Sequence, residues 1–252
     1  MFSWFRNRRR RKILARAFPE TWEAILAENA RFASELDLEQ QSKLRGAIQV
    51  LVAEKNWEGC GGLQLRDEHR VTIAAQIARM TLHFEHEYFE AVQSILVYPT
   101  AYLARSIADM GSGVVVEGQS GRAGEAWYRG PVILSWADVL STGRGQRGAH
   151  NVVVHEFAHQ FDMRNGPFAD GIPVIESPAL AQRWNAVMSA ACEELGEMCR
   201  RGMPSIIDCY GATDRAEFFA VASEAYFEQP QALHHQWPEV FDLLEQFYSP
   251  PP

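Results

Sequence analysis

The sequence predicts an α+β fold that is mostly helical with a small central mixed sheet. Apolar residues recur at helical spacing in several long segments on both sides of the middle of the chain. The middle itself holds short β-branched and aromatic runs punctuated by glycine, which are typical of strands. Because the helical segments outnumber the strands and the strands cluster, we expect an α+β arrangement in one domain.

The first half of the chain supplies three helices and then the strands. Helical spacing of apolar residues predicts helices within 19–36, 39–57 and 72–84. A β-branched and aromatic run over 94–103 predicts a strand, and Pro99 inside it indicates an edge position or a strand end. Residues 112–136 hold two apolar runs between glycines, which favours a hairpin or meander.

The second half is predicted to be helical up to its end. Apolar residues again follow helical spacing, and glycine or proline closes three of the four segments. The expected helices span about 149–163, 177–202, 214–230 and 238–248.

Charge is distributed unevenly along the chain. The 252 residues, 47% of them hydrophobic, carry a net charge of −8. Seven basic side chains precede residue 18, which leaves 17 basic against 32 acidic residues and a net charge of −15 elsewhere. We therefore expect residues 1–19 to form a basic, flexible tail and residues 20–252 to form a single domain that binds no nucleic acid directly. The basic residues of the tail are Arg6, Arg8, Arg9, Arg10, Arg11, Lys12 and Arg16.

Hydropathy and cysteine usage predict a cytoplasmic location. No stretch approaches the roughly 20 consecutive apolar residues that a membrane span needs, and no apolar region of a secretory signal follows the arginines. The cysteines at 60, 192, 199 and 209 form no C-x-x-C pair. In a chain of this length we expect them to be reduced thiols.

The stretch NVVVHEFAHQFD, residues 151–162, carries an H-E-x-x-H motif. On a helix, His155 and His159 face the same side, so each imidazole can give one nitrogen to a single Zn²⁺. Glu156 lies beside the first ligand, where its carboxylate can take a proton from a water that the metal activates. Burying two histidines and a glutamate without such a partner is costly, so the motif predicts one zinc ion per chain.

A catalytic zinc site needs a third protein ligand and an open position. The longer pattern H-E-x-x-H-x-x-G-x-x-H fails here, because Asp162 and Asn165 stand where its glycine and third histidine belong. The third ligand must therefore come from further along the chain. His234 and His235 are candidates, although they lie close to its end.

Two glutamates of the 214–230 segment are the other candidates for the third ligand. Glu217 and Glu224 are seven residues apart and share one helical face, among apolar residues where an unpaired carboxylate is costly. Asp214 and Glu217 also fit a capping box at the start of this helix, which gives Glu217 a purely structural interpretation. Spacing alone does not choose between Glu217 and Glu224.

Three histidine and glutamate positions outside the motif receive a different interpretation. His83, His86 and Glu90 have the spacing of one helical face, which also fits a second metal site. We interpret them as solvated side chains, because such spacings are common on exposed helices.

Several segments together resemble the Mlc titration factor A family, which are zinc-dependent peptidases with a catalytic core similar to that of anthrax lethal factor. The H-E-x-x-H motif is shared by many peptidases, but its combination with the later tyrosine and glutamate block is specific. The resemblance covers most of the chain from about Leu44 onward. The matching segments are SILVYP, GPVILSW, NVVVHEFAHQFDMRNG, IIDCYGATDRAEFFAVASEAYF and LEQFY.

The resemblance implies a zincin-like metallopeptidase fold and a role for each site residue. His155 and His159 would bind zinc, Glu156 would be the general base, and Glu217 would be the third ligand. Tyr210, seven residues before that ligand, would be a catalytic tyrosine that donates a hydrogen bond to the developing oxyanion. The role of Glu224 would then be structural, or one of supporting a ligand.

The expected partners also follow from the resemblance. As a zinc metallopeptidase, the chain would take a peptide or protein substrate. The family is named for capturing a transcriptional repressor of sugar-uptake genes, so a repressor of the Mlc type is an expected partner. The alternative function is a non-catalytic anti-repressor that binds and sequesters this regulator.

Overall fold

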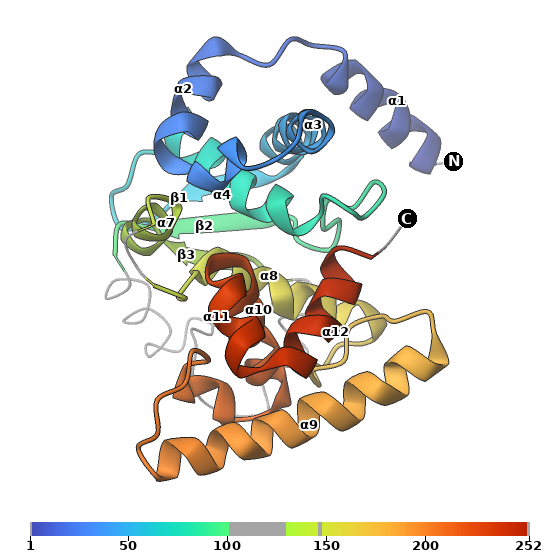
Figure 1. Cartoon of the computed structure of the whole chain (residues 1–252). Helices are drawn as coiled ribbons and strands as arrows, with labels where there is room; N and C mark the ends of the chain where they lie inside the picture. Colours follow the sequence, from blue (N-terminus) through green and yellow to red (C-terminus); the bar gives the residue numbers. More distant parts are fainter. Residues whose placement is uncertain (1, 101–129, 146–147, 251–252) are drawn as a thin grey trace. The chain divides into compact units, whose positions relative to one another are not determined.

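The computed structural model describes residues 2–100, 130–145 and 148–250 (Figure 1). These residues fall into two compact units: residues 2–100 and 131–145 belong to the first, and residues 130 and 148–250 belong to the second. Helices dominate both units, as predicted. The helices of the first unit are α1 (Phe2–Leu14), α2 (Glu20–Asn29), α3 (Leu38–Glu54), α4 (Asp67–Met80) and α7 (Trp136–Gly143), with the 3₁₀ turn η1 (Arg31–Ser34).

The sheet of the first unit has the order β1-β2-β3, from β1 (Asn56–Gly59), β2 (Ser94–Tyr98) and β3 (Val132–Ser135). Both pairings are parallel, so the described part of this sheet is parallel and not mixed. Of the segment expected to form a hairpin or meander, residues 112–136, the part up to residue 129 lies outside the described residues, as do residues 101–103 of the strand expected over 94–103. Strand β1 was not predicted: its first two residues, Asn56 and Trp57, were assigned to the end of the preceding helix, and its last two to no element.

Pro99 directly follows β2, which confirms the prediction of a strand end. The edge position is wrong among the described strands, since β2 lies between the other two. Proline ends the pairing there because it has no N–H to donate.

The segment expected to be a basic, flexible tail, residues 1–19, contains a helix. Residues 2–14 form helix α1, on which Ile13 and Arg10 are buried. The Arg10 guanidinium donates hydrogen bonds to both carboxylate oxygens of Glu54 and to Glu90. These contacts fix α1 within the first unit.

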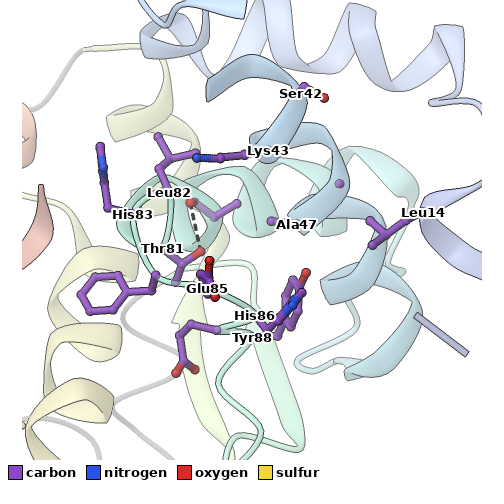
Figure 2. Close-up of a pocket in the computed structure, with 14 residues that line it drawn as sticks. Leu14, Ser42, Lys43, Ala47, Thr81, Leu82, His83, Glu85, His86 and Tyr88 are labelled. Carbon is purple, nitrogen blue, oxygen red and sulfur yellow. Dashed lines mark hydrogen bonds between the residues drawn. The ribbon is translucent and has the colours of Figure 1, made fainter. Parts of the chain in front are cut away.

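The segment after α4 also differs from its prediction. Helix α4 ends at Met80, and His86 has a positive φ of 57°, so His83, His86 and Glu90 do not share a helical face. His83 and His86 are exposed, in agreement with their interpretation as solvated, whereas Glu90 is paired with the buried Arg10. His83 and His86 line a hollow of about 360 Å³ together with residues of α3 and with Leu14 (Figure 2).

The second unit holds the predicted helices and one further helix. Proline at position 230 ends one helix and begins the next, so the end predicted there is confirmed and α11 was missed. Among the described residues, no helix combines the length and the apolar composition needed to cross a bilayer. The helices are α8 (Val152–Asp162), α9 (Pro178–Arg200), α10 (Arg215–Glu228), α11 (Pro230–Gln236) and α12 (Pro238–Tyr248), with the 3₁₀ turns η2 (Met163–Asn165) and η3 (Cys209–Ala212).

Gly171, in the segment between α8 and α9, contacts three helices. Gly171 N donates a hydrogen bond of 2.7 Å to Asp162 at the end of α8, and its carbonyl oxygen accepts one of 2.8 Å from Trp184 of α9. Its φ of +80° favours glycine. A Cβ at this position would lie 2.5 Å from the carbonyl oxygen of Arg215, the first residue of α10, so only glycine fits without a shift.

The expectation of four reduced cysteines is wrong for two of them. Cys199, at the end of α9, forms a disulfide with Cys209 of η3, whereas Cys60 and Cys192 are free thiols. Gly202, with a φ of +64°, lies in the turn that brings the chain back from α9 to η3. The disulfide therefore ties η3 to α9.

Candidate metal centre

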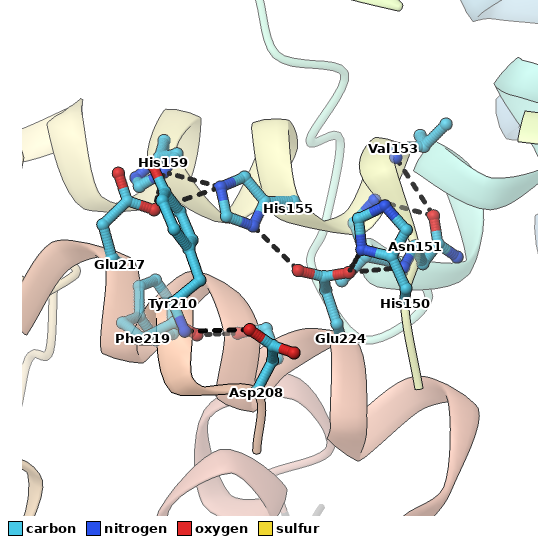
Figure 3. A network of polar contacts seen from close by, with 12 residues as sticks. His150, Asn151, Val153, His155, His159, Asp208, Tyr210, Glu217, Phe219 and Glu224 are labelled. Carbon is cyan, nitrogen blue, oxygen red and sulfur yellow. Dashed lines mark hydrogen bonds and ion pairs between the residues drawn. The ribbon is translucent and has the colours of Figure 1, made fainter. Parts of the chain in front are cut away.

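Helix α8 carries the H-E-x-x-H motif and begins at a side-chain cap. Asn151 Oδ1 accepts hydrogen bonds from the backbone N–H groups of Val153 (3.0 Å) and Val154 (3.1 Å), which satisfies two donors that the helix itself leaves unpaired. Val153, Val154 and Phe157 are fully buried. Their burial fixes the rotation of α8, so that His155 and His159 both face α10 (Figure 3).

Three side-chain atoms from α8 and α10 meet in a triangle. Glu217 Oε2 lies 3.2 Å from His155 Nε2 and 3.5 Å from His159 Nε2, and the two imidazole nitrogens are 3.3 Å apart. Ligand atoms at 2.0–2.1 Å from a tetrahedral zinc ion are separated by about 3.3 Å. The triangle thus has the size of one face of such a coordination tetrahedron.

The protonation of this triangle also fits a cation. His155 Nδ1 lies 2.8 Å from Glu224 Oε1 and is the nitrogen that donates to this carboxylate, so Nε2 of the neutral ring presents a lone pair. Glu217 Oε2 is buried and lacks a hydrogen-bond partner among the described residues. A carboxylate oxygen facing imidazole lone pairs in a buried place is unfavourable without a positive charge between them.

The pKa values respond to the same crowding. Burial raises the pKa of Glu217, but His155 and His159 lower it by more than this, so that it lies well below its ordinary value. Burial lowers the pKa of His155, yet the carboxylates of Glu217 and Glu224 raise it well above its ordinary value. In the absence of a metal, a proton on His155 therefore supplies the positive charge that the carboxylates favour.

Glu224 lies behind the triangle and holds His155 by its other nitrogen. Only 2% of Glu224 is exposed, and besides His155 it accepts hydrogen bonds from the backbone N–H of Asn151 and, at 2.9 Å, from His150 Nδ1. Burial raises the pKa of Glu224, but His150 and His155 lower it by more than this. The carboxylate is therefore ionised. Glu224 therefore orients the His155 ring and contributes no atom to the triangle.

His150 has a contact that its sequence position did not reveal. It lies five residues before His155, off the face that carries the two imidazoles, yet its ring reaches the far oxygen of Glu224 (Figure 3). The sequence carries no periodic signal for this contact, because residue 150 precedes the helix and is positioned by the loop.

Tyr210 and Glu156 lie near the triangle without belonging to it. The ring centre of Tyr210 is 6.1 Å from that of His155, and Figure 3 shows the phenol extending toward the same space as Glu217 and His159. Asp208 caps η3 by accepting the N–H of Tyr210 at 2.8 Å. Glu156 is half-buried on α8, next in sequence to His155.

The other predicted candidates for the third ligand lie elsewhere. His234 and His235 are exposed on α11 and do not enter the triangle. Asp214 accepts a hydrogen bond of 3.0 Å from the backbone N–H of Glu217, which confirms the helix cap, while the Glu217 side chain turns to the histidines. Among the described residues, His155, His159 and Glu217 form the one group of three or more such side chains able to hold a metal ion.

Comparison with known proteins agrees with a metal site. Residues 4–249 match the family of glucose-regulated metallo-peptidases M90. This match includes most of α1 and so extends well before Leu44, where the resemblance was expected to begin.

Individual relatives extend over most of the chain. An uncharacterized protein of Synechocystis sp. is 35% identical over 241 residues, which cover 95% of this chain and 87% of the relative. Mlc titration factor A of Serratia proteamaculans is 32% identical (92% and 87% covered), and that of Cronobacter sakazakii is 31% identical (93% and 87% covered). The chain therefore belongs to the M90 family of metallo-peptidases, which confirms the resemblance to Mlc titration factor A.

Proposed function

We propose that this protein is a zinc-dependent peptidase whose metal is held by His155, His159 and Glu217. The observation that carries the proposal is the triangle of donor atoms with edges of 3.2, 3.3 and 3.5 Å. Two imidazoles and one carboxylate are a donor set of catalytic zinc sites, in which a fourth position stays open for water or substrate. When bound there, zinc would polarise the peptide carbonyl and lower the pKa of a water molecule.

The chain's own side chains would carry out the proton transfers. Glu156 accepts a proton from the water that attacks the peptide carbonyl carbon, and returns it to the amine that leaves when the C–N bond breaks. Tyr210 donates a hydrogen bond to the carbonyl oxygen as that oxygen becomes negative. Glu224 keeps the Nδ1 proton of His155 in place, which would leave the Nε2 lone pair available to a metal ion.

Zinc content and peptide hydrolysis, measured on the same preparations, test these roles. Glu156→Gln should keep one zinc per chain and lose hydrolysis, whereas Glu217→Ala should lose zinc and hydrolysis together. Tyr210→Phe should keep zinc and lower kcat about 100-fold, the usual loss when one donor to an oxyanion is removed. A full zinc complement in Glu217→Ala, with zinc lost in Glu224→Ala, would show that the ligand assignment is wrong.

A second proposal rests on the name of two of the relatives, Mlc titration factor A. A protein of this kind would act by binding a transcriptional regulator, with cleavage secondary. The Glu156→Gln variant separates the two proposals, since it keeps the fold and removes only the proton acceptor. If regulator-dependent transcription still responds to this variant, binding is sufficient; if the response disappears, hydrolysis is required.

A further inference from the structure

A buried arginine and its neighbour attach helix α1 to the first unit: Arg9 donates a hydrogen bond of 3.1 Å to the carbonyl oxygen of Ala53, and Arg10 binds two carboxylates. Arg10 is buried, forms a two-point ion pair with Glu54 (shortest distance 2.7 Å) and a second ion pair with Glu90 (2.9 Å). Its guanidinium carbon also lies 4.3 Å from the centre of the Tyr88 ring. Ile13, one turn further along, is also buried. The contacts define an inner face and hold the opposite face outward.

The outward face combines aromatic and basic side chains. Two residues along a helix correspond to a rotation of about 200°, so Arg8 and Lys12 point away from Arg10. Trp4 lies one turn before Arg8, and Phe5 lies beside it. Trp4 is 53% exposed and Phe5 is 60% exposed, and their rings touch with centres 5.0 Å apart. Arg8 extends over the Trp4 ring at 5.6 Å.

Exposing this face to water is unfavourable, because it combines like charges with apolar rings. The helix contains no acidic residue, so like charges one turn apart, such as Arg8 and Lys12, destabilise it. Two contacting aromatic rings that are more than half exposed form an apolar patch within this basic surface. Anionic headgroups would neutralise the charges, and the interfacial layer beneath them would accept the rings.

We propose that the outward face of α1, formed by Trp4, Phe5, Arg8, Arg11 and Lys12, binds an anionic lipid surface. Basic residues supply attraction to the headgroups, and Trp4 and Phe5 insert at the boundary with the acyl chains. A long nucleic acid is disfavoured as the ligand, because the chain outside its basic start has a net charge of −15 and would repel it. The proposal is independent of the peptidase function.

Vesicle flotation of the full-length protein tests this surface. The wild type should float with phosphatidylcholine vesicles that contain phosphatidylglycerol and should not float with phosphatidylcholine alone. Each basic residue near an anionic surface changes affinity about fivefold, so the triple variant Arg8→Gln, Arg11→Gln, Lys12→Gln should bind about 100-fold more weakly. Arg10 and Ile13 are unchanged in this variant, so the anchor of α1 remains.

A matched control separates the surface from overall charge. The triple variant Arg183→Gln, Arg200→Gln, Arg201→Gln removes three exposed basic residues from α9 and its end, and should bind almost as the wild type does. Trp4→Ala with Phe5→Ala should weaken binding while leaving its salt dependence unchanged. Equal losses in the two triple variants would overturn the proposal. So would binding of an oligonucleotide by a wild type that does not float with anionic vesicles.

Discussion

Replacing Glu224 by glutamine tests how the centre is held together. The side chain keeps its size, but an amide has one oxygen where the carboxylate has two. In the wild type, one oxygen accepts from His155 Nδ1 at 2.8 Å and the other accepts from the Asn151 N–H and from His150. If the amide oxygen serves His155, the amide nitrogen faces the Asn151 N–H, and two donors oppose each other in a place that is 2% exposed.

The size of the effect follows from these contacts. A buried N–H that loses its acceptor costs about 1–3 kcal/mol, so the metal-free variant should lose that much unfolding free energy. Loss of the partner that orients a ligand histidine usually weakens metal binding 10–100-fold. We therefore expect the zinc Kd of Glu224→Gln to rise 10–100-fold, which corresponds to about 1.4–2.7 kcal/mol.

Competition with a chromophoric chelator measures the zinc Kd, and urea unfolding of the metal-free protein measures stability. Glu228→Gln is the matched control, because Glu228 lies one turn further along α10 and accepts a hydrogen bond from the Asn151 side chain at 2.9 Å. Its zinc Kd should stay near that of the wild type. A Glu224→Gln variant that loses stability but binds zinc as tightly as the wild type would refute the reasoning.

Three further predictions concern protons, the disulfide and a buried lysine. Zinc binding at neutral pH should release protons, because the carboxylates of Glu217 and Glu224 outweigh burial and raise the pKa of His155 well above its ordinary value. Calorimetry in two buffers of different ionisation enthalpy should therefore give different apparent binding enthalpies. Equal enthalpies would contradict this. Reduction of Cys199–Cys209, ten residues apart, should lower the unfolding free energy by about 3 kcal/mol, and the Cys199→Ser, Cys209→Ser variant should show that loss without reductant. Burial lowers the pKa of Lys55 from 10.5 to about 8, so between these pH values the unfolded chain binds more protons and the unfolding free energy gains a contribution that rises with pH. Urea unfolding across this range should show a smaller rise for Lys55→Met, and an unchanged profile would rule out this role.

Local patterns in the sequence were sufficient for most helices and for part of the centre. The apolar spacing around residues 152–162 predicts α8, and the same spacing places His155 and His159 on one face, as found. Proline at 230 predicts where α10 stops, because it cannot continue the hydrogen-bond ladder of that helix. These features depend on neighbours within one or two turns, which the sequence displays directly.

The features that local patterns could not predict depend on contacts between distant segments. Glu217 and Glu224 lie on the same side of α10, and both reach His155, one at Nε2 and the other at Nδ1. Which of them enters the triangle depends on how α10 is placed along α8, a tertiary quantity that spacing does not contain. Only the family resemblance pointed to Glu217, and the structure brings its carboxylate to the two histidines.

Strand β1 and the disulfide could not be predicted from the sequence for similar reasons. The four residues of β1, NWEG, have no apolar alternation and gain their structure from pairing with β2. The Cys199–Cys209 pair requires the chain to reverse direction between α9 and η3. Neither event leaves a periodic signal.

The contacts of Gly171 imply that the spacing of the donor atoms is controlled from a residue that donates nothing to them. Arg215, against which a methyl group at 171 would press, is two residues before Glu217, whereas Asp162 is three residues after His159. Any side chain at 171 would therefore push α10 away from α8. The Glu217 carboxylate would move away from the two imidazoles, although every donor atom remained chemically intact. A chain that binds metal poorly with all its ligands present would direct attention to this loop.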